Sequence, residues 1–467
     1  AGHFQKSRHM SRRSLVQLSL GAVVTGALTL MLGCAGCSTK PPVKAPPPPR
    51  AAAPSAPVLP PEKLPPVMLG IDVLEADGFR AIAGKKIGLL THRAGVNRRG
   101  ESTIDVLRRA PGVKLVALYA GEHGIYGDLP AEKKYPDQVD PRTGIMVYSL
   151  YSGVAYKGKS FKASPAQLKN IDALVVDLQD IGTRSYTFTS AMKLAVEACF
   201  ENGKEVIILD RPNPLGGLKV DGPPLDAQWM SYVGAFRVPY VHGLTMGELA
   251  TMAKQAPGVL AVSEKIRAKG RLTVIPMRGW TRNMRWPETE LRWIPTSPMV
   301  ADFEAVVGYA MVGLGCEQNS WSSGIGKEFP FRGISYPRKT PDEIITAMGA
   351  YQIPGIRLVK RQGLSPEGQS RTGVYVEISD WEKWNPTELS FYMHKQAAKW
   401  ERLNPFVGLT ATEQRTFKIH VGSNAWFAEL QRAVEDRNLR FALGDDSAVE
   451  IDDALGHARA RGRMLFG

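Results

Sequence analysis

Charged and amide side chains follow several predicted strands of this 467-residue chain, at the points where the strands end. The polar stretches lie at 91–97, 121–127, 179–187 and 210–217, and a His-Gly pair follows at 242–243. In open parallel α/β sheets, ligands bind beyond the carboxyl ends of the strands. We therefore expect these stretches to meet at one rim of a sheet and to form a single site.

A carboxylate-rich rim of this kind favours hydrolysis of a glycosidic bond. That reaction typically uses a protonated carboxyl group to assist the leaving oxygen and a second carboxylate that activates water or attacks directly. Glu122 is the first candidate for the acid/base, because the flanking Gly121 and Gly124 allow close approach of a substrate. His123 can hold its orientation or tune its pKa. The alternative is that Glu122 caps the next element and pairs with a nearby arginine.

Two further carboxylates are candidates for the second catalytic group. Asp177 and Asp180 flank the end of a predicted strand on opposite faces, and Asp180 is the better placed of the two. Glu197 interrupts the apolar run 194–200, and burial there would raise its pKa, as a general acid requires. Glu197 lies about ten residues into its predicted helix, so a solvated or ion-paired helix face is an equal interpretation.

Cationic and polar residues at the same rim are candidates for substrate binding. Arg184 and Arg211 can clamp an acidic group, since a guanidinium matches a carboxylate bidentately, or they can pair with neighbouring aspartates as part of the structure. Tyr186 can stack on a sugar face. The remaining substrate-binding candidates are His92, Asn213, His242 and Glu317.

Metal, nucleotide and nucleic-acid chemistry are not expected. The histidines at the rim are too scattered for a zinc-ligand pattern, and neither a G-x-G-x-x-G fingerprint nor a P-loop lysine follows a strand, so no cofactor is predicted. The formal charge is +14, but residues 1–66 carry eight basic residues against one acidic residue, and the other basic residues are scattered. Nucleic acid is therefore not an expected partner.

The elements that must position the site alternate between continuous apolar strands and helices, which is typical of a parallel sheet covered on both faces. We expect an α/β fold with a Rossmann-like parallel-sheet catalytic domain at 67–285 and a second, smaller α+β domain at 286–467 that completes the cleft. The predicted strands of the first domain are 86–91, 114–119, 146–150, 173–178 and 205–209, and its helices include 102–109, 188–202 and 245–255.

The chain begins with a segment at 1–40 that resembles a leader rather than a domain. Residues 1–10 are excluded from the fold, and Arg12-Arg13 with the apolar run to Gly33 is typical of a twin-arginine export signal. A single membrane-anchoring helix is the alternative. We expect an exported protein.

The cysteines that follow the apolar run of this leader resemble the acylation site of a bacterial lipoprotein. Cys34 or Cys37 is the predicted acylated residue, with a plain signal peptide as the competing interpretation. A linker follows at 41–66, which holds 12 of the 34 prolines and favours an extended spacer. The expected location is the periplasm or the cell envelope, with membrane contact only through the lipid anchor or the signal.

Four motifs of the rim carry a resemblance to a known family: Gly121-Glu122-His123-Gly124, Asp177-Leu178-Gln179-Asp180-Ile181-Gly182-Thr183-Arg184, Asp210-Arg211-Pro212-Asn213-Pro214 and His242-Gly243-Leu244-Thr245. The sequence resembles bacterial exo-β-N-acetylmuramidases, which are glycoside hydrolases. The resemblance implies release of N-acetylmuramic acid from non-reducing ends of peptidoglycan fragments, at a cleft between a Rossmann-like and a smaller domain. It also implies that Glu122 is the catalytic acid and that Glu197 matches a second glutamate. Arg184 or Arg211 would then meet the lactyl carboxylate of the sugar.

One stretch departs from the family's pattern. At 317–326, Ser323 stands where the family has an acidic residue and Ile325 where it has an arginine. Because loss of a charge pair changes contacts at a sugar cleft, the alternative function is a catalytically impaired glycan-binding lipoprotein of the envelope. Another exported hydrolase, acting on an ester or an amide, is a third hypothesis.

Overall fold

The computed structural model describes residues 66–153, 161–325, 329–365, 368–401 and 404–435. These residues belong to one compact unit, Glu62–Gly467. The predicted export signal, Cys34, Cys37 and all of the proline-rich linker except Pro66 lie outside the described residues.

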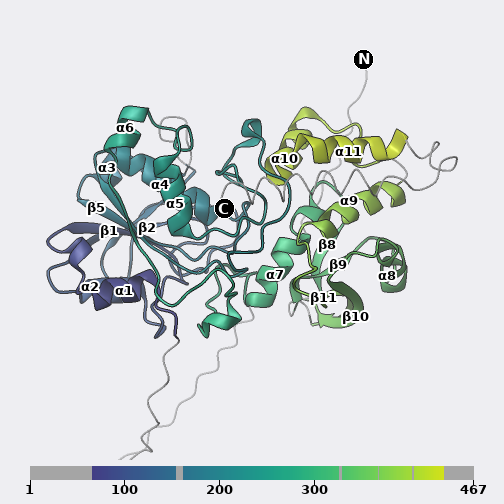
Figure 1. Cartoon of the computed structure of the whole chain (residues 1–467), viewed down its shortest axis with the longest axis horizontal. Helices are drawn as coiled ribbons and strands as arrows, with labels where there is room; N and C mark the ends of the chain where they lie inside the picture. Colours follow the sequence, from purple (N-terminus) through teal and green to yellow (C-terminus); the bar gives the residue numbers. More distant parts are fainter. Residues whose placement is uncertain (1–65, 154–160, 326–328, 366–367, 402–403, 436–467) are drawn as a thin grey trace, which may run out of the picture. The chain divides into compact units, whose positions relative to one another are not determined.

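The first part of the chain forms a seven-stranded sheet in the order β3-β4-β2-β1-β5-β6-β7 (Figure 1). All neighbours pair in parallel except β3, which pairs antiparallel with β4. The strands are β1 Lys86–Thr91, β2 Lys114–Ala120, β3 Gln138–Val139, β4 Met146–Ser149, β5 Ala173–Asp177, β6 Glu205–Leu209 and β7 Leu272–Ile275. The chain runs outward from β1 in one direction and then restarts at β5 on the other side. This places a topological switch point between β1 and β5.

Helices cover both faces of this sheet. They are α1 Gly70–Ala76, α2 Thr103–Arg108, α3 Pro165–Leu168, α4 Thr187–Glu201, α5 Met246–Gln255 and α6 Glu264–Lys269. Successive strand side chains point to opposite faces. Leu89 and Val175 pack in the core on one side, and Leu90 and Val176 pack in the core on the other. The continuous apolar strands recognised in the sequence are therefore buried on both faces.

Local capping chemistry fixes the helix ends near the rim. The Ser102 hydroxyl accepts a hydrogen bond from the Ile104 N–H at the start of α2. Thr245 and Glu248 form a reciprocal capping box at the start of α5, directly after the His-Gly pair. At the end of α4, Gly203 has a φ of +66°, which glycine adopts without strain. These signals explain why the predicted helices lie within one residue of the observed ones.

The second part of the chain carries a smaller antiparallel sheet in the order β10-β11-β9-β8 (Figure 1). Its strands are β8 Ser322–Ile325, β9 Phe329–Ser335, β10 Ile356–Leu364 and β11 Ser370–Ile378. Its helices are α7 Phe303–Val312, α8 Pro341–Gly349, α9 Glu388–Trp400, α10 Ala411–Val421 and α11 Asn424–Glu435, with a short 3-10 turn, η4, at Leu314–Cys316. The predicted α/β fold with a mainly parallel sheet and a smaller α+β part is confirmed, whereas the domain boundary at 285/286 stays a prediction.

Several elements of the first part were not expected from the sequence: the helices α1, α3 and α6 and the strands β3 and β7. The side chains of β7 are half-buried at the sheet edge, and β3 is only two residues long, so neither gives a strong apolar pattern. No helix in the described part of the chain is long and apolar enough to cross a membrane.

Candidate functional site

The turn after β2 presents Glu122 at the rim of the parallel sheet. His123 and Gly124 both have positive φ angles, +68° and +73°, and reverse the chain immediately after the strand. The left-handed conformation is uncommon for a residue other than glycine, although histidine is among the side chains enriched there. The glutamate side chain is left half-buried. It is therefore neither sealed in the core nor freely solvated.

Three donors hold the Glu122 carboxylate in one orientation. The Tyr151 hydroxyl and the Glu132 backbone N–H donate to its Oε1, at 3.2 and 2.9 Å. The Thr187 hydroxyl donates to its Oε2 at 3.0 Å. Thr187 is the first residue of α4, and the positive end of a helix dipole favours a carboxylate there. The alternative of a glutamate paired with an arginine has no support, since no ion pair of Glu122 occurs among the described residues.

His123 lies against this turn. Its Nδ1 is 2.8 Å from the Leu129 carbonyl oxygen, and a carbonyl can only accept, so Nδ1 carries a proton. In the neutral ring, Nε2 is then the nitrogen with the lone pair. The predicted role in orienting Glu122 stays a prediction, because no contact joins the two side chains in the described part of the chain.

Asp180, which follows β5, forms a buried pair with His242. Its Oδ2 accepts the Gly182 N–H at 2.8 Å and lies 3.4 Å from His242 Nε2. His242 Nδ1 accepts the Leu244 N–H, which places the ring proton on Nε2, facing Asp180. The second carboxylate oxygen, Oδ1, is buried without a hydrogen-bond partner among the described residues. The structure thus brings the predicted site residues Asp180 and His242 together and leaves Asp180 Oδ1 able to accept a hydrogen bond.

Glu317 reaches the same region from the second part of the chain. It follows η4, and its side chain keeps 27% of its surface exposed, with Oε2 at 3.7 Å from His420 Nδ1 in α10. Burial raises the pKa of Glu317, and nearby His420 only partly opposes this effect. A carboxyl group with a raised pKa stays protonated to a higher pH, which is what a general acid needs.

The charges of three predicted carboxylates act on Tyr309 of α7. Burial is the main cause that raises its pKa to about 12, and the negative charges of Glu317, Glu122 and Asp180 add to the effect. A negative charge nearby disfavours the ionised form of a phenol. The charges of these carboxylates, which come from separate stretches of the sequence, therefore act on one phenol group, whose oxygen is 3.3 Å from the Ser185 hydroxyl.

His92 and Tyr186 form an inner wall beside this cluster. Both rings contact Phe188 edge-on, with centroids 4.5 and 4.9 Å apart. His92 Nε2 accepts the Gln179 N–H, and burial lowers the pKa of His92 to about 3, so this ring stays neutral at all physiological pH values. The Tyr186 hydroxyl donates to Thr296. Since both rings are buried, neither is open to stack on a sugar in this conformation.

The structure does not support Arg184 as a clamp for a substrate carboxylate. The residue is 1% exposed, and its Nη atoms donate to the carbonyl oxygens of Pro223, Val238 and Val421 at 2.7–2.8 Å. Burial lowers the pKa of Arg184 to about 10. We correct the prediction: Arg184 ties the loop after β5 to the end of α10.

Arg211 and Asn213 are likewise held within the protein. Arg211 forms a bidentate ion pair with Asp177, at 2.6 Å from Nε to Oδ1 and 2.8 Å from Nη2 to Oδ2. Asn213 bridges backbone groups of Leu244 and Leu215. The structural alternative that the sequence left open for Arg211 is the one observed, with Asp177 as its partner. A substrate-binding role for Asn213 is not supported.

Glu197 lies away from the Tyr309 cluster. It is 1% exposed, accepts the Ala261 N–H at 2.8 Å and lies 3.5 Å from Lys162 Nζ. Thr187, which contacts Glu122, is ten residues earlier in α4, and this separation corresponds to about 15 Å along the helix. The structure therefore supports the ion-paired interpretation of Glu197 and not a second catalytic carboxylate beside Glu122.

A cavity of about 400 Å³ lies beside α4 and is lined by Phe161, Tyr232 and Glu197 among others. Tyr151, which donates to Glu122, lies in one aromatic cluster with Phe161 and Tyr232, with ring centroids 4.0–6.3 Å apart. Two residues of the cavity wall are thus packed against Tyr151, the tyrosine that donates to Glu122. No group of three or more potential metal ligands occurs among the residues that the structure describes.

Several residues at the site were missed by sequence reasoning: Tyr151, Thr187, Tyr309 and His420. Thr187 and Tyr151 lie in or near predicted loops, and a hydroxyl close to a candidate carboxylate is a usable but common signal. Tyr309 and His420 lie on helices of the second part, where no motif marks them. Only their position in the folded chain identifies them.

Comparison with known proteins decides the family. Residues 87–304 match the family model described as "Exo-beta-N-acetylmuramidase NamZ, N-terminal", and residues 307–448 match its C-terminal counterpart. The chain belongs to the exo-β-N-acetylmuramidase family. The predicted family and the predicted enzyme class, a glycosidase, are both confirmed.

A curated relative and two solved structures agree with this assignment. The peptidoglycan β-N-acetylmuramidase NamZ of Bacillus subtilis is 36% identical over 327 residues, which cover 69% of this chain and 75% of that protein. A crystal structure of a DUF1343 family protein from Bacteroides fragilis is 34% identical, with a TM-score of 0.68, over 79% of this chain and 94% of that one. A second, at 24% identity and a TM-score of 0.60, covers 85% and 96% and shows the same fold.

Proposed function

We propose that this protein is an exo-acting glycoside hydrolase that releases N-acetylmuramic acid from the non-reducing ends of peptidoglycan fragments. The observation that carries the proposal is that Glu122, held by three hydrogen bonds at the rim, and Glu317, from the second part of the chain, both act electrostatically on Tyr309. Two carboxyl groups from different elements at one site are what glycoside hydrolysis requires. The curated relative, named as a peptidoglycan β-N-acetylmuramidase, supports the choice of substrate.

The two carboxyl groups have different surroundings and therefore different proposed roles. Glu317 has a pKa raised by burial, so we assign it the general acid that protonates the leaving oxygen. Glu122 accepts three hydrogen bonds, which fix its orientation as the second catalytic carboxylate. Asp180 and His242 are positioning residues, since both are almost fully buried.

A comparison of leaving groups tests these roles. A general acid matters most when the leaving oxygen is strongly basic, and its removal costs about 10²–10⁴-fold in rate. Glu317→Gln should therefore lose most activity on a muramic-acid-containing disaccharide, while hydrolysis of a 4-nitrophenyl N-acetylmuramide, whose leaving group needs no proton, is largely retained. Glu122→Gln should abolish both activities.

Thermal unfolding of both variants provides the control, because a loss of activity with an unchanged or higher melting temperature is not a folding defect. Equal losses on both substrates in Glu317→Gln would reject the acid assignment. Wild-type protein that is folded yet releases no N-acetylmuramic acid would reject the proposal itself.

The altered stretch at 317–326 motivates the alternative of an impaired, glycan-binding protein. Ile325 is buried in β8, and the Cβ atoms that Gly333 and Gly373 lack would fall within 3 Å of its side chain. The isoleucine side chain thus packs against Gly333 and Gly373 of the neighbouring strands, at a position where the family has an arginine. Muropeptide binding by calorimetry without product formation would select this alternative.

Export and lipid anchoring complete the proposal. The Arg12-Arg13 leader and the cysteines Cys34 and Cys37 suit a periplasmic or envelope-anchored lipoprotein that meets peptidoglycan fragments where they arise. Fractionation of cells that express Cys34→Ala, Cys37→Ala or both tests the anchor. We expect one single variant to move the protein from the membrane fraction to the soluble fraction, and membrane retention in the double variant would exclude lipidation at these cysteines.

A further inference from the structure

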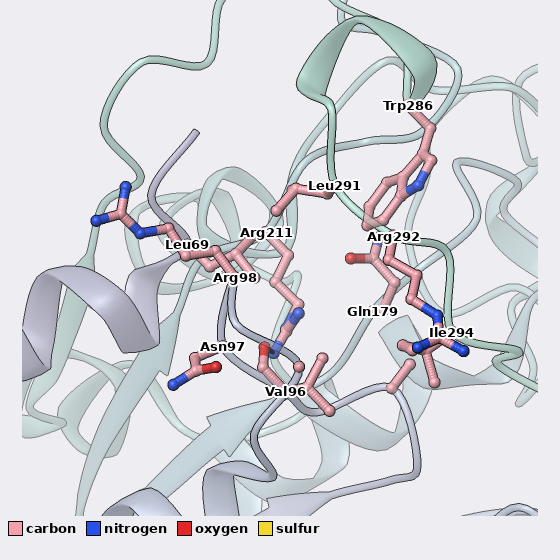
Figure 2. A pocket seen from close by; sticks show the side chains of 12 residues that line it. Leu69, Val96, Asn97, Arg98, Gln179, Arg211, Trp286, Leu291, Arg292 and Ile294 are labelled. Atoms are coloured by element: carbon pink, nitrogen blue, oxygen red, sulfur yellow. Dashed lines mark hydrogen bonds between the residues drawn. The ribbon is translucent and has the colours of Figure 1, made fainter. Parts of the chain in front are cut away.

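A second, smaller cavity lies at the carboxyl ends of β1, β5 and β6, at the topological switch point of the sheet (Figure 2). Its volume is about 30 Å³. A buried water needs about 10–15 Å³ by the same measure, so the cavity holds a group of a few non-hydrogen atoms and excludes a sugar ring. Its polar lining comes from Asn97, Arg98, Gln179, Arg211, Trp286 and Arg292.

Arg211 presents one guanidinium nitrogen to this cavity without a protein partner. Its Nε and Nη2 are bound by Asp177 and by the Val96 carbonyl oxygen. No hydrogen bond of Nη1 occurs among the described residues, although the whole side chain is only 2% exposed. A guanidinium nitrogen can only donate, so Nη1 can bind a ligand that supplies an oxygen.

Gln179 presents the opposite requirement. Its Nε2 donates to the carbonyl oxygens of Asp180 and Pro212, both at 2.9 Å, and this fixes which end of the amide is the oxygen. That oxygen, Oε1, has no donor among the described residues, and Gln179 is 1% exposed. Trp286 Nε1 is also buried without an acceptor. The cavity therefore offers donors together with one acceptor.

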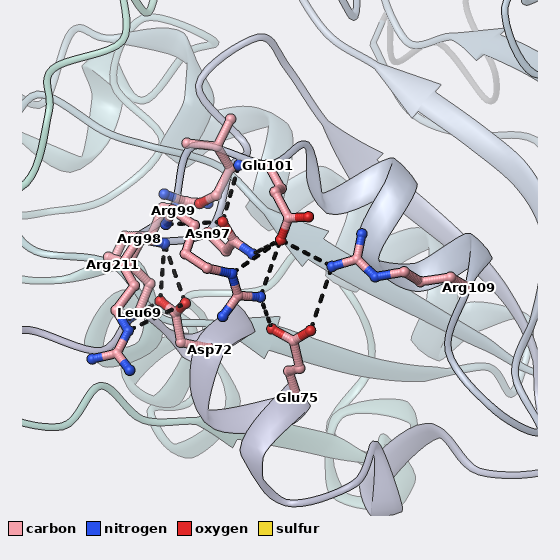
Figure 3. Close-up of polar contacts among 10 residues, drawn as sticks. Leu69, Asp72, Glu75, Asn97, Arg98, Arg99, Glu101, Arg109 and Arg211 are labelled. Atoms are coloured by element: carbon pink, nitrogen blue, oxygen red, sulfur yellow. Dashed lines mark hydrogen bonds and ion pairs between the residues drawn. The ribbon is translucent and has the colours of Figure 1, made fainter. Parts of the chain in front are cut away.

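The loop that forms one wall is held by an extensive polar network (Figure 3). Both carboxylate oxygens of Asp72 accept the Arg98 N–H, and its Oδ2 also accepts the Leu69 N–H at 2.8 Å. Asn97 donates to Glu101 at 2.8 Å. The wall is thus fixed by the protein itself before any ligand arrives.

The charges around the cavity leave one positive charge in excess. Arg211 is paired with Asp177, and Arg98 lies 3.9 Å from Asp72. Arg292 also lines the cavity, from a residue that is exposed at the surface, and no ion pair of Arg292 occurs in the described part of the chain. A ligand with a single negative charge balances the site.

We propose that this cavity binds a small oxyanion with a single negative charge and a hydroxyl group, the chemistry shared by dihydrogen phosphate and by short 2-hydroxycarboxylates. The anionic oxygens accept from Arg211 Nη1, Trp286 Nε1 and Arg292, and the hydroxyl group donates to Gln179 Oε1. Gln179 lines the site, and Asp180 does not. This proposal does not depend on the proposed hydrolysis, because the experiment below measures binding of the small anion and not activity.

Thermal unfolding and calorimetry of the purified full chain test the proposal with phosphate, glycolate and acetate at constant ionic strength. A ligand that binds only the folded state raises the melting temperature. We expect phosphate or glycolate to raise the melting temperature. The one that does so shows whether the ligand is a phosphate or a 2-hydroxycarboxylate. Acetate, which lacks the hydroxyl group, should bind at least about tenfold more weakly, a loss typical of one unmade hydrogen bond.

Two variants and one matched control make the test specific to the cavity. Arg292→Gln and Trp286→Phe each remove a donor, and each should weaken binding of the responding ligand about tenfold. Arg371→Gln removes an exposed charge from β11 and should leave binding unchanged. The proposal is overturned if neither phosphate nor glycolate binds, if acetate binds as well as the responding ligand, or if Arg371→Gln weakens binding as much as Arg292→Gln does.

Discussion

Asp210, at the end of β6, makes the stability of this protein depend on pH in a calculable way. Its carboxylate is 7% exposed. Oδ1 accepts the backbone N–H groups of Gly247 and Arg211, at 2.8 and 3.0 Å, and Oδ2 accepts the Thr245 hydroxyl at 2.9 Å. Burial nevertheless outweighs these bonds and raises the pKa of Asp210 from 3.8 to about 6.

The sign and size of the effect follow from this difference. The folded state binds the Asp210 proton more tightly than the unfolded state, so this group's contribution is most favourable below about pH 4 and is lost as the pH rises to about 6. Each pH unit of difference corresponds to about 1.4 kcal/mol, which gives about 3 kcal/mol at neutral pH. An asparagine keeps an oxygen for the two backbone N–H groups and can donate to Thr245, but it carries no charge. We expect Asp210→Asn to stabilise the protein by about 1–3 kcal/mol at pH 7.

Urea unfolding of wild type and Asp210→Asn, at several values between pH 4 and pH 7, measures the effect. Other carboxylates titrate equally in both proteins, so the difference in unfolding free energy isolates Asp210. That difference should grow in favour of the variant between about pH 4 and 6 and then level off. Asp128→Asn, at an exposed position, is the matched control and should show no such growth. A difference that stays constant with pH, or that favours wild type more strongly at pH 7 than at pH 4, would refute the reasoning.

Three further predictions follow from the site. Arg184→Met should lower the free energy of unfolding by about 2–5 kcal/mol, because it leaves three buried carbonyl oxygens without a charged donor; an unchanged denaturant midpoint would argue against its structural role. Thr187→Ala should lower kcat/KM by about tenfold to a hundredfold through the lost hydrogen bond to Glu122, and unaltered kinetics would remove Thr187 from the site. Cys199 is fully buried, and its pKa is raised to about 12, so peptide mapping should find it alkylated only after unfolding; labelling of the native protein would contradict its burial.

The sequence by itself determined the elements of the parallel sheet and the loops that carry the chemistry. The apolar runs of β1 and β5 and the capping residue Ser102 are local signals, because strand burial and helix starts depend on a few consecutive residues. The rule that ligands meet parallel sheets at the strand ends then placed Glu122 and Asp180 at one rim. Both directly follow strands of the observed parallel sheet, and the charges of both act on Tyr309.

Tertiary structure alone decided what each charged side chain does at that rim. Arg184 and Arg211 have the same chemistry in the sequence, yet Arg184 is enclosed by carbonyl oxygens from distant segments and Arg211 is bound to Asp177. Glu197 meets Lys162, and Glu317 meets His420, over a hundred residues away. The physical reason is that pKa, accessibility and pairing depend on which groups lie within a few ångströms, and long-range contacts decide this.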